Sequence, residues 1–239
     1  MTAMAHTTAP RTAPRASALL RDRLDLARPA LDAVTARLWQ PDGLAERYRV
    51  YLEVMYDVTR SSVPLMLRAA ALCANAPESG DPVAVPLRRY LEAHAREESG
   101  HDDWLRQDLE LLCAAPDRTA APPAVVARLV GPQYYWLEHY HPVTVLGYIA
   151  VMEATAPRSG VPGRIAACAE VPDAALRTLR EHVELDAGHT GAVLRMLDAL
   201  PLSDGQARAV ALSGLHTAHG LIALYEHILR TAHVWKDTR

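Results

Sequence analysis

The chain has 239 residues and half of them are hydrophobic, which supports a packed core and excludes a disordered protein. The net charge of −3 offers no basic surface of the kind that binds nucleic acid. No segment reaches the roughly 18 consecutive apolar residues of a membrane span, and the first residues lack the apolar stretch of a secretory signal. The three cysteines are odd in number and far apart, which indicates reduced thiols and a cytoplasmic protein.

Helical periodicity begins at Ser17, and residues 1–16, rich in Thr, Ala, Pro and Arg, are expected to form a flexible tail. Residues 17–239 are expected to form a single domain. No segment alternates with a period of two, so the fold class is predicted to be all-α, with seven to nine helices. In chain order, helices are predicted over 17–38, 44–74, 87–112, 124–130, 133–140 and 142–155, then, after a turn at 158–163 and a short helix, over 172–200 and 204–233.

Two of the long predicted helices carry the same His-x3-acid-x2-His pattern. Residues with these spacings lie on one face of a helix. Mixed imidazole and carboxylate ligands suit iron, manganese or zinc, and helical bundles build such sites from facing helices. One such motif alone is as well explained by a solvated polar face, but two copies favour a metal site. The two motifs consist of His94, Glu98 and His101, and of His182, Asp186 and His189.

A further acid, Glu153, lies in the apolar segment 143–155. A buried carboxylate is costly unless it is paired or bound to a metal, so Glu153 is expected to join the same site. Because carboxylates can bridge two cations, the site is predicted to be dinuclear. Tyr148, little more than one helical turn before Glu153, is expected to line the pocket.

Several neighbouring residues allow two interpretations. His94 is either a ligand or a group that orients a ligand. Glu53, flanked by apolar residues, is either another carboxylate ligand or half of a surface ion pair. Glu97 is expected on the solvent side. His227 and the other histidines of 204–233 are expected to be packing or surface groups.

These motifs resemble those of the haem-oxygenase-like di-iron oxidases, which are also described as iron-containing redox enzymes. The resemblance covers residues 43–233 and is carried by segments 92–112, 143–155 and 181–200, in that order. It implies an all-α, single-domain, haem-oxygenase-like bundle with a central substrate cavity. Carried over position by position, it implies six metal ligands, which are Glu98, His101, Glu153, His182, Asp186 and His189.

Two residues of this sequence differ from the usual ligand pattern of the family or add to it. Some members have a Glu seven residues before the first ligand His, where this chain has His94. Others recruit a Glu from the preceding helix, for which Glu53 is the candidate. The resemblance implies no catalytic residues beyond the metal ligands.

The resemblance further implies two Fe²⁺ ions as cofactors and O₂ as co-substrate. The expected activity is oxidation of a small molecule (an amino acid, an amine or a fatty acid) by N-oxygenation, desaturation or C–C cleavage, in secondary metabolism. No Gly-x-Gly-x-x-Gly motif follows a predicted strand, so the electrons are expected from an external donor or from the substrate. The expected partners are a small-molecule substrate and neither nucleic acid nor membrane. The oligomeric state is left open, with a homodimer among the states considered.

Other activities of the same fold make different demands on the sequence. Haem would require a proximal His that is not crowded by carboxylates. A thiaminase-like hydrolase would require a Cys nucleophile in the pocket, and no cysteine lies on the motif faces. The remaining alternative is a non-catalytic helical protein that binds metal.

Overall fold

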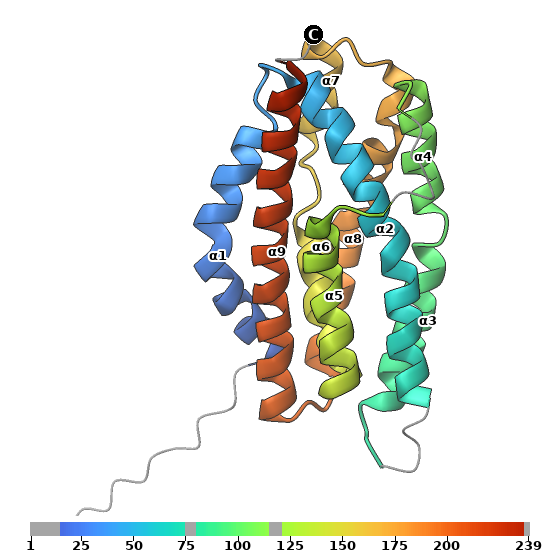
Figure 1. The fold of residues 1–239 in the computed structure, drawn as a ribbon. Helices are drawn as coiled ribbons and strands as arrows, with labels where there is room; N and C mark the ends of the chain where they lie inside the picture. The colour runs from blue at the N-terminus through green and yellow to red at the C-terminus, as the bar shows by residue number, and fades with distance from the viewer. Residues whose placement is uncertain (1–14, 75–79, 115–120, 237–239) are drawn as a thin grey trace, which may run out of the picture.

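The computed structural model describes residues 15–74, 80–114 and 121–236, apart from the side chains of 185–187 and 233–236. Every regular element within these residues is helical, which confirms the predicted all-α class. Residues 1–14, most of the predicted tail, lie outside the described residues. The elements are α1 (Ala16–Leu38), α2 (Leu44–Ala74), α3 (Ala84–Glu97), α4 (His101–Leu111), α5 (Ala124–His139), η2 (Pro142–Thr144), α6 (Val145–Ala154), α7 (Gly160–Cys168), η3 (Asp173–Leu176), α8 (Arg177–Ala199) and α9 (Asp204–Lys236) (Figure 1).

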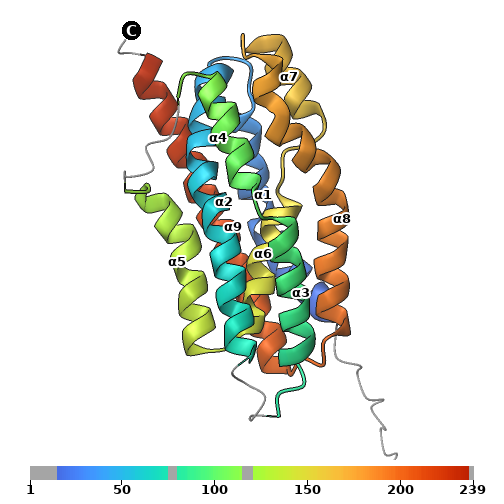
Figure 2. The ribbon, with the colours of Figure 1, turned by 90° about the vertical axis from the view of Figure 1, so that its right-hand side faces the viewer.

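The long helices run side by side, and α6 lies in the interior of the bundle (Figures 1 and 2). α1 packs along α9, while α2 packs against α3 and α4. α6 contacts both α8 and α9, and each of its residues from Val145 to Val151 is buried. The apolar run that carries Tyr148 and Glu153 is therefore a central helix. None of the described helices has the length and apolarity needed to cross a membrane.

The prediction of one helix over 87–112 was wrong. α3 ends at Glu97 and α4 begins at His101, with Gly100 between them in the left-handed region at φ 93°. An L-residue rarely adopts this conformation, whereas glycine does so without a steric penalty. The helix pair consequently changes direction inside the first His-acid-His motif.

Two further boundaries differ from the predictions, and in both cases a proline lies within the observed helix. The segments 124–130 and 133–140 form the single helix α5, with Pro132 inside it and a buried face that packs on α9 and α2. This packing holds the helix together although one backbone hydrogen bond is lost. α7 begins inside the turn predicted at 158–163, because Pro162 occupies its first turn, where no N–H donor is needed.

Side chains cap the N-terminus of the last helix, α9. The Ser203 hydroxyl accepts a hydrogen bond from the Gln206 N–H at 3.2 Å, and the Ser203 N–H donates to the Gln206 side-chain oxygen at 2.9 Å. This reciprocal pair is a capping box, and it satisfies two N–H groups at the start of α9.

The backbones of α6 and α9 approach each other closely at two glycines. A Cβ atom placed on Gly147 would lie 2.7 Å from the Gly214 nitrogen and would also meet the carbonyl oxygen of Val210. Only glycine fits here, because the neighbouring atoms belong to backbone that cannot rotate away. The contact sets the depth of α6, and hence of Glu153, in the bundle.

Gly147→Ala should therefore destabilise the protein, by about 1–3 kcal/mol, because the added methyl group forces α6 and α9 apart. The matched control is Gly131→Ala in α5, where a Cβ meets open space. Because Gly131 precedes Pro132, whose ring restricts a Cβ on the preceding residue, a second control is Gly163→Ala in α7, where a Cβ also meets open space and which should stabilise by roughly 0.5–1 kcal/mol. Urea unfolding followed by circular dichroism measures all three; equal effects of Gly147→Ala and Gly163→Ala would contradict the close contact.

The three cysteines should differ in reactivity. Cys73 is buried, and burial raises the pKa of its thiol to about 11, whereas Cys113 and Cys168 are exposed. Because the thiolate is the reactive form, two thiols should be alkylated rapidly in the native protein at pH 8 and the third only after unfolding. Mass spectrometry of iodoacetamide-treated protein counts the modified sites, and rapid labelling of Cys73 would contradict its burial.

Candidate metal centre

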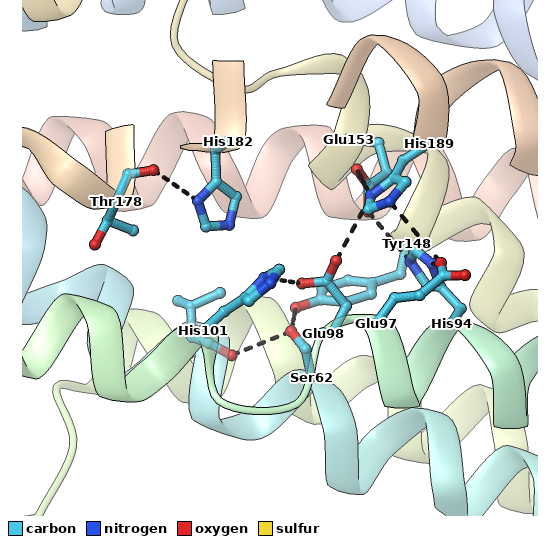
Figure 3. A network of polar contacts seen from close by, with 11 residues as sticks. Ser62, His94, Glu97, Glu98, His101, Tyr148, Glu153, Thr178, His182 and His189 are labelled. Atoms are coloured by element: carbon cyan, nitrogen blue, oxygen red, sulfur yellow. Dashed lines mark hydrogen bonds and ion pairs between the residues drawn. The ribbon is translucent and has the colours of Figure 1, made fainter. Parts of the chain in front are cut away.

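Polar side chains from α3, α4, α6 and α8 converge inside the bundle (Figure 3). Of these, His94, Glu98, Glu153 and His182 border a cavity of about 100 Å³ whose other walls are mainly apolar. One face of α2 supplies part of this wall, a role that was not predicted from the sequence. The spacing of four α2 residues could have indicated this face, because they recur at intervals of three or four residues: Met55, Thr59, Ser62 and Met66.

Four residues form the first group of potential ligands, which we call position A: His94, Glu98, Glu153 and His189. One ligand atom from each lies within 4.8 Å of all the others. The Nε2 atom of His94 is 3.2 Å from Glu153 Oε1, and the Nδ1 atom of His189 is 3.4 Å from Glu153 Oε2. Of the two interpretations of His94, the geometry places it among the potential ligands.

Glu98, His101 and His182 form a second group, position B, by the same distance criterion. The Nδ1–H of His101 donates a hydrogen bond to Glu98 Oε2 at 3.0 Å, and the rings of His101 and His182 meet edge to face at 5.0 Å. The other oxygen of Glu98 lies 3.6 Å from His189 Nδ1 in position A. Glu98 thus belongs to both groups, one through each carboxylate oxygen.

The two His-acid-His motifs lie side by side in antiparallel orientation. The first histidine of one motif, His94, contacts the last of the other, His189, with ring centroids 5.2 Å apart. His101 correspondingly meets His182. Two motifs of equal length on helices that run in opposite directions therefore pair end to end and create two neighbouring positions.

The protonation of His182 is fixed by its surroundings. Its Nδ1 atom lies 2.9 Å from the Thr178 carbonyl oxygen, which can only accept, so Nδ1 carries the proton. Burial lowers the pKa of His182, which keeps the ring neutral. The Nε2 lone pair is then available to a metal.

One buried nitrogen atom in position A lacks a hydrogen-bond partner. Among the described residues, the buried Nδ1 of His189 has no hydrogen-bond partner, although carboxylate oxygens of Glu98 and Glu153 lie near it. A buried nitrogen without a partner is costly, and a bound cation would satisfy it. The donor set of imidazoles and carboxylates fits iron, and this orphaned atom shows that the residues present suit a metal ion.

The charges of the site are balanced from within it. Burial by itself would raise the pKa of Glu98, but the hydrogen bond from His101 and the nearby His94 and His182 lower it overall. Burial would likewise lower the pKa of His94, but Glu153 and Glu98 raise it overall. Among the described residues that line the cavity there is no Lys or Arg. The carboxylates thus depend on imidazolium groups or on metal ions for compensation.

The remaining predicted site residues have different locations. Tyr148 lies on the cavity wall, and its hydroxyl is 3.2 Å from Ser62 Oγ. The structure does not bring Glu53 to either position: its carboxylate pairs with Arg49 on the same helix, which matches the ion-pair alternative. The side chain of Asp186 lies outside the described residues. Glu97 is largely exposed, as expected, yet its carboxylate approaches His94 and His189.

Comparison with protein-family models identifies the chain. The model of the iron-containing redox enzyme family matches residues 49–219, which include both motifs and Glu153. The protein belongs to this family. Membership agrees with the ligand chemistry of the cavity, and it confirms the resemblance seen in the sequence. A search of the curated proteins finds no match.

Solved structures confirm the fold. A domain of unknown function with a heme oxygenase-like fold from Shewanella denitrificans OS217 superposes with a TM-score of 0.74 and 15% identity, covering 94% of this chain and 96% of that one. A TenA homolog from Pseudomonas syringae pv. tomato DC3000 gives a TM-score of 0.68 and 17% identity, covering 93% of this chain and 99% of that one. The protein therefore has the heme oxygenase-like fold.

Substitutions should separate the two positions, because only Glu98 is common to both. His182→Ala should lose the metal ion of position B, and His189→Ala that of position A, while Glu98→Ala should weaken both. His227→Ala, in a half-buried residue of α9 apart from both positions, is the control. Metal content after anaerobic loading with Fe²⁺ measures the effect. Loss of both ions in His182→Ala but none in Glu98→Ala would contradict the assignment.

Proposed function

We propose that this member of the iron-containing redox enzyme family is a non-haem di-iron oxidoreductase that uses O₂ to oxidise a small molecule. The observation that carries the proposal is the pair of adjacent positions that share Glu98 beside one cavity of the bundle. A single-metal site or a solvated polar face has no need of a carboxylate placed between two groups of imidazoles.

The residues that would hold the ions follow from the two groups. His94, Glu98, Glu153 and His189 would hold one Fe²⁺, and Glu98, His101 and His182 the other. Asp186 is proposed as a further ligand from the motif pattern. Bound iron would supply the O₂-binding positions and the redox chemistry of the reaction.

The walls of the cavity favour reactions that need a site with little water. Apolar side chains from α2 and α6, among them Met55, Leu52 and Ile149, form part of the cavity wall. Such walls strengthen electrostatic interactions inside the site and limit side reactions with solvent. Burial raises the pKa of Tyr148 to about 12, so this phenol keeps its proton at neutral pH. The Ser62 hydroxyl donates to the Val58 carbonyl oxygen, and Tyr148 then donates to Ser62.

The residues that line the cavity suggest how a substrate would be oriented in it. Its described lining residues include no Lys or Arg to bind an anionic group. We propose that the polar group of the substrate, an amino acid, an amine or a fatty acid, lies at the ions while its apolar part contacts the walls. Electrons beyond those of the substrate would come from an external donor.

The geometry disfavours the other activities of this fold. Carboxylate oxygens lie close to His94, His101 and His189, and a Glu98 oxygen lies within 4.8 Å of a His182 ring nitrogen, so each histidine has a carboxylate nearby, which disfavours a haem ligand. The cavity lining contains no cysteine among the described residues, so a thiol nucleophile is not supplied.

O₂ consumption by anaerobically loaded protein tests the proposal. The protein containing Fe²⁺ should consume O₂ in the presence of a substrate and release an oxidised product that mass spectrometry identifies from a panel of amino acids, amines and fatty acids. Glu98→Ala should abolish this reaction, because it removes the ligand common to both positions, whereas His227→Ala should retain it. Protein that binds two ions but consumes no O₂ with any compound would favour the non-catalytic alternative.

A further inference from the structure

Glu97, the last residue of α3, contacts two imidazoles of position A from outside (Figure 3). Its Oε2 atom lies 3.5 Å from His94 Nδ1 and 3.8 Å from His189 Nε2. These are the ring nitrogens opposite those that approach Glu153, which are His94 Nε2 and His189 Nδ1. Each ring therefore lies between Glu97 on its outer side and Glu153 on its inner side.

We propose that Glu97 is a positioning residue that orients both imidazoles of position A toward the metal. The inference rests on the proposed metal site. A neutral imidazole carries one N–H group and one lone pair, on different nitrogens. When the N–H points to Glu97, the lone pair is on the nitrogen that faces Glu153 and Glu98. A carboxylate in this place fixes the ring orientation and increases the basicity of the ligand nitrogen.

The local structure explains how Glu97 reaches two helices. His94 and Glu97 are three residues apart in α3 and lie on neighbouring parts of its surface. Glu97 and Glu98 are consecutive, so their side chains leave the backbone in directions about 100° apart. They approach the His189 ring from two sides: Glu98 Oε1 is 3.6 Å from Nδ1, and Glu97 Oε2 is 3.8 Å from Nε2.

In position B, the ring nitrogen of His182 that would face away from the metal has a different hydrogen-bond partner. The Nδ1–H of His182 donates to the Thr178 carbonyl oxygen, a neutral acceptor, and Glu97 contacts neither histidine of that position in the structure. A change at Glu97 should consequently act on position A alone. This asymmetry distinguishes an orienting role from a general contribution to stability.

The experiment compares Glu97→Ala and Glu97→Gln with Glu92→Ala. Glu92 is another exposed carboxylate of α3, and it lies 3.7 Å from Arg88. Equilibrium dialysis with Co²⁺ under argon gives the stoichiometry and both dissociation constants, and the visible Co²⁺ spectrum reports the coordination of each ion. Thermal unfolding of the metal-free variants shows whether folding is preserved.

Glu97→Ala should still bind two Co²⁺ ions at saturation, but one of the two affinities should fall by about 10–100-fold, the usual effect of losing such a partner. Glu97→Gln, which keeps an acceptor oxygen, should retain more of the affinity, and Glu92→Ala should match the unsubstituted protein. Both affinities falling alike, or neither falling, would overturn the inference. So would loss of one ion at saturation, since Glu97 would then be a ligand. Failure of the unsubstituted protein to bind two ions would instead overturn the proposed function.

Discussion

The placement of two carboxylates in the interior of an apolar helical bundle is the constraint on which the site depends. Glu98 and Glu153 have side-chain exposures of 15% and 10%, and the described cavity lining supplies no Lys or Arg to neutralise them. Moving an ionised carboxylate out of water costs several kcal/mol or more unless a cation or strong hydrogen bonds compensate it. Imidazoles from three helices surround both groups, and a bound metal ion would complete the compensation.

The surrounding fold serves to hold these groups at the required distances. α6 is buried over most of its length, and the close approach of Gly147 to Gly214 sets its position against α9. The helix break at Gly100 lies between the ligands of one motif, so α3 and α4 deliver His94 and His101 to separate positions. Glu98, at the end of α3, is the residue that both positions share. A site of this kind needs rigid elements, because small errors in ligand placement weaken metal binding.

The fold and the chemistry have separate evidence. The neighbouring structures share 15% and 17% identity with this chain, which establishes a common fold and leaves the activity open. The family match over residues 49–219 adds iron and redox chemistry at the level of the family. The finer proposal of a di-iron oxidase rests on the arrangement of Glu98 between two groups of histidines, which is a property of the site and of these particular residues.

The sequence by itself determined the helical class, the apolar α6 with its single acid and the two His-acid-His motifs. These features are local, since periodicity and spacing within one segment report which residues share a face. Only the tertiary structure decided which histidines pair, because the pairing depends on the opposite directions of α3–α4 and α8. It also decided that Glu53 pairs with Arg49 and that Glu97, though exposed, contacts His94 and His189. The contacts of Glu97 involve a helix end and a partner distant in sequence, and the choice for Glu53 depends on whether its face of α2 reaches the histidines; periodicity within one segment reports neither.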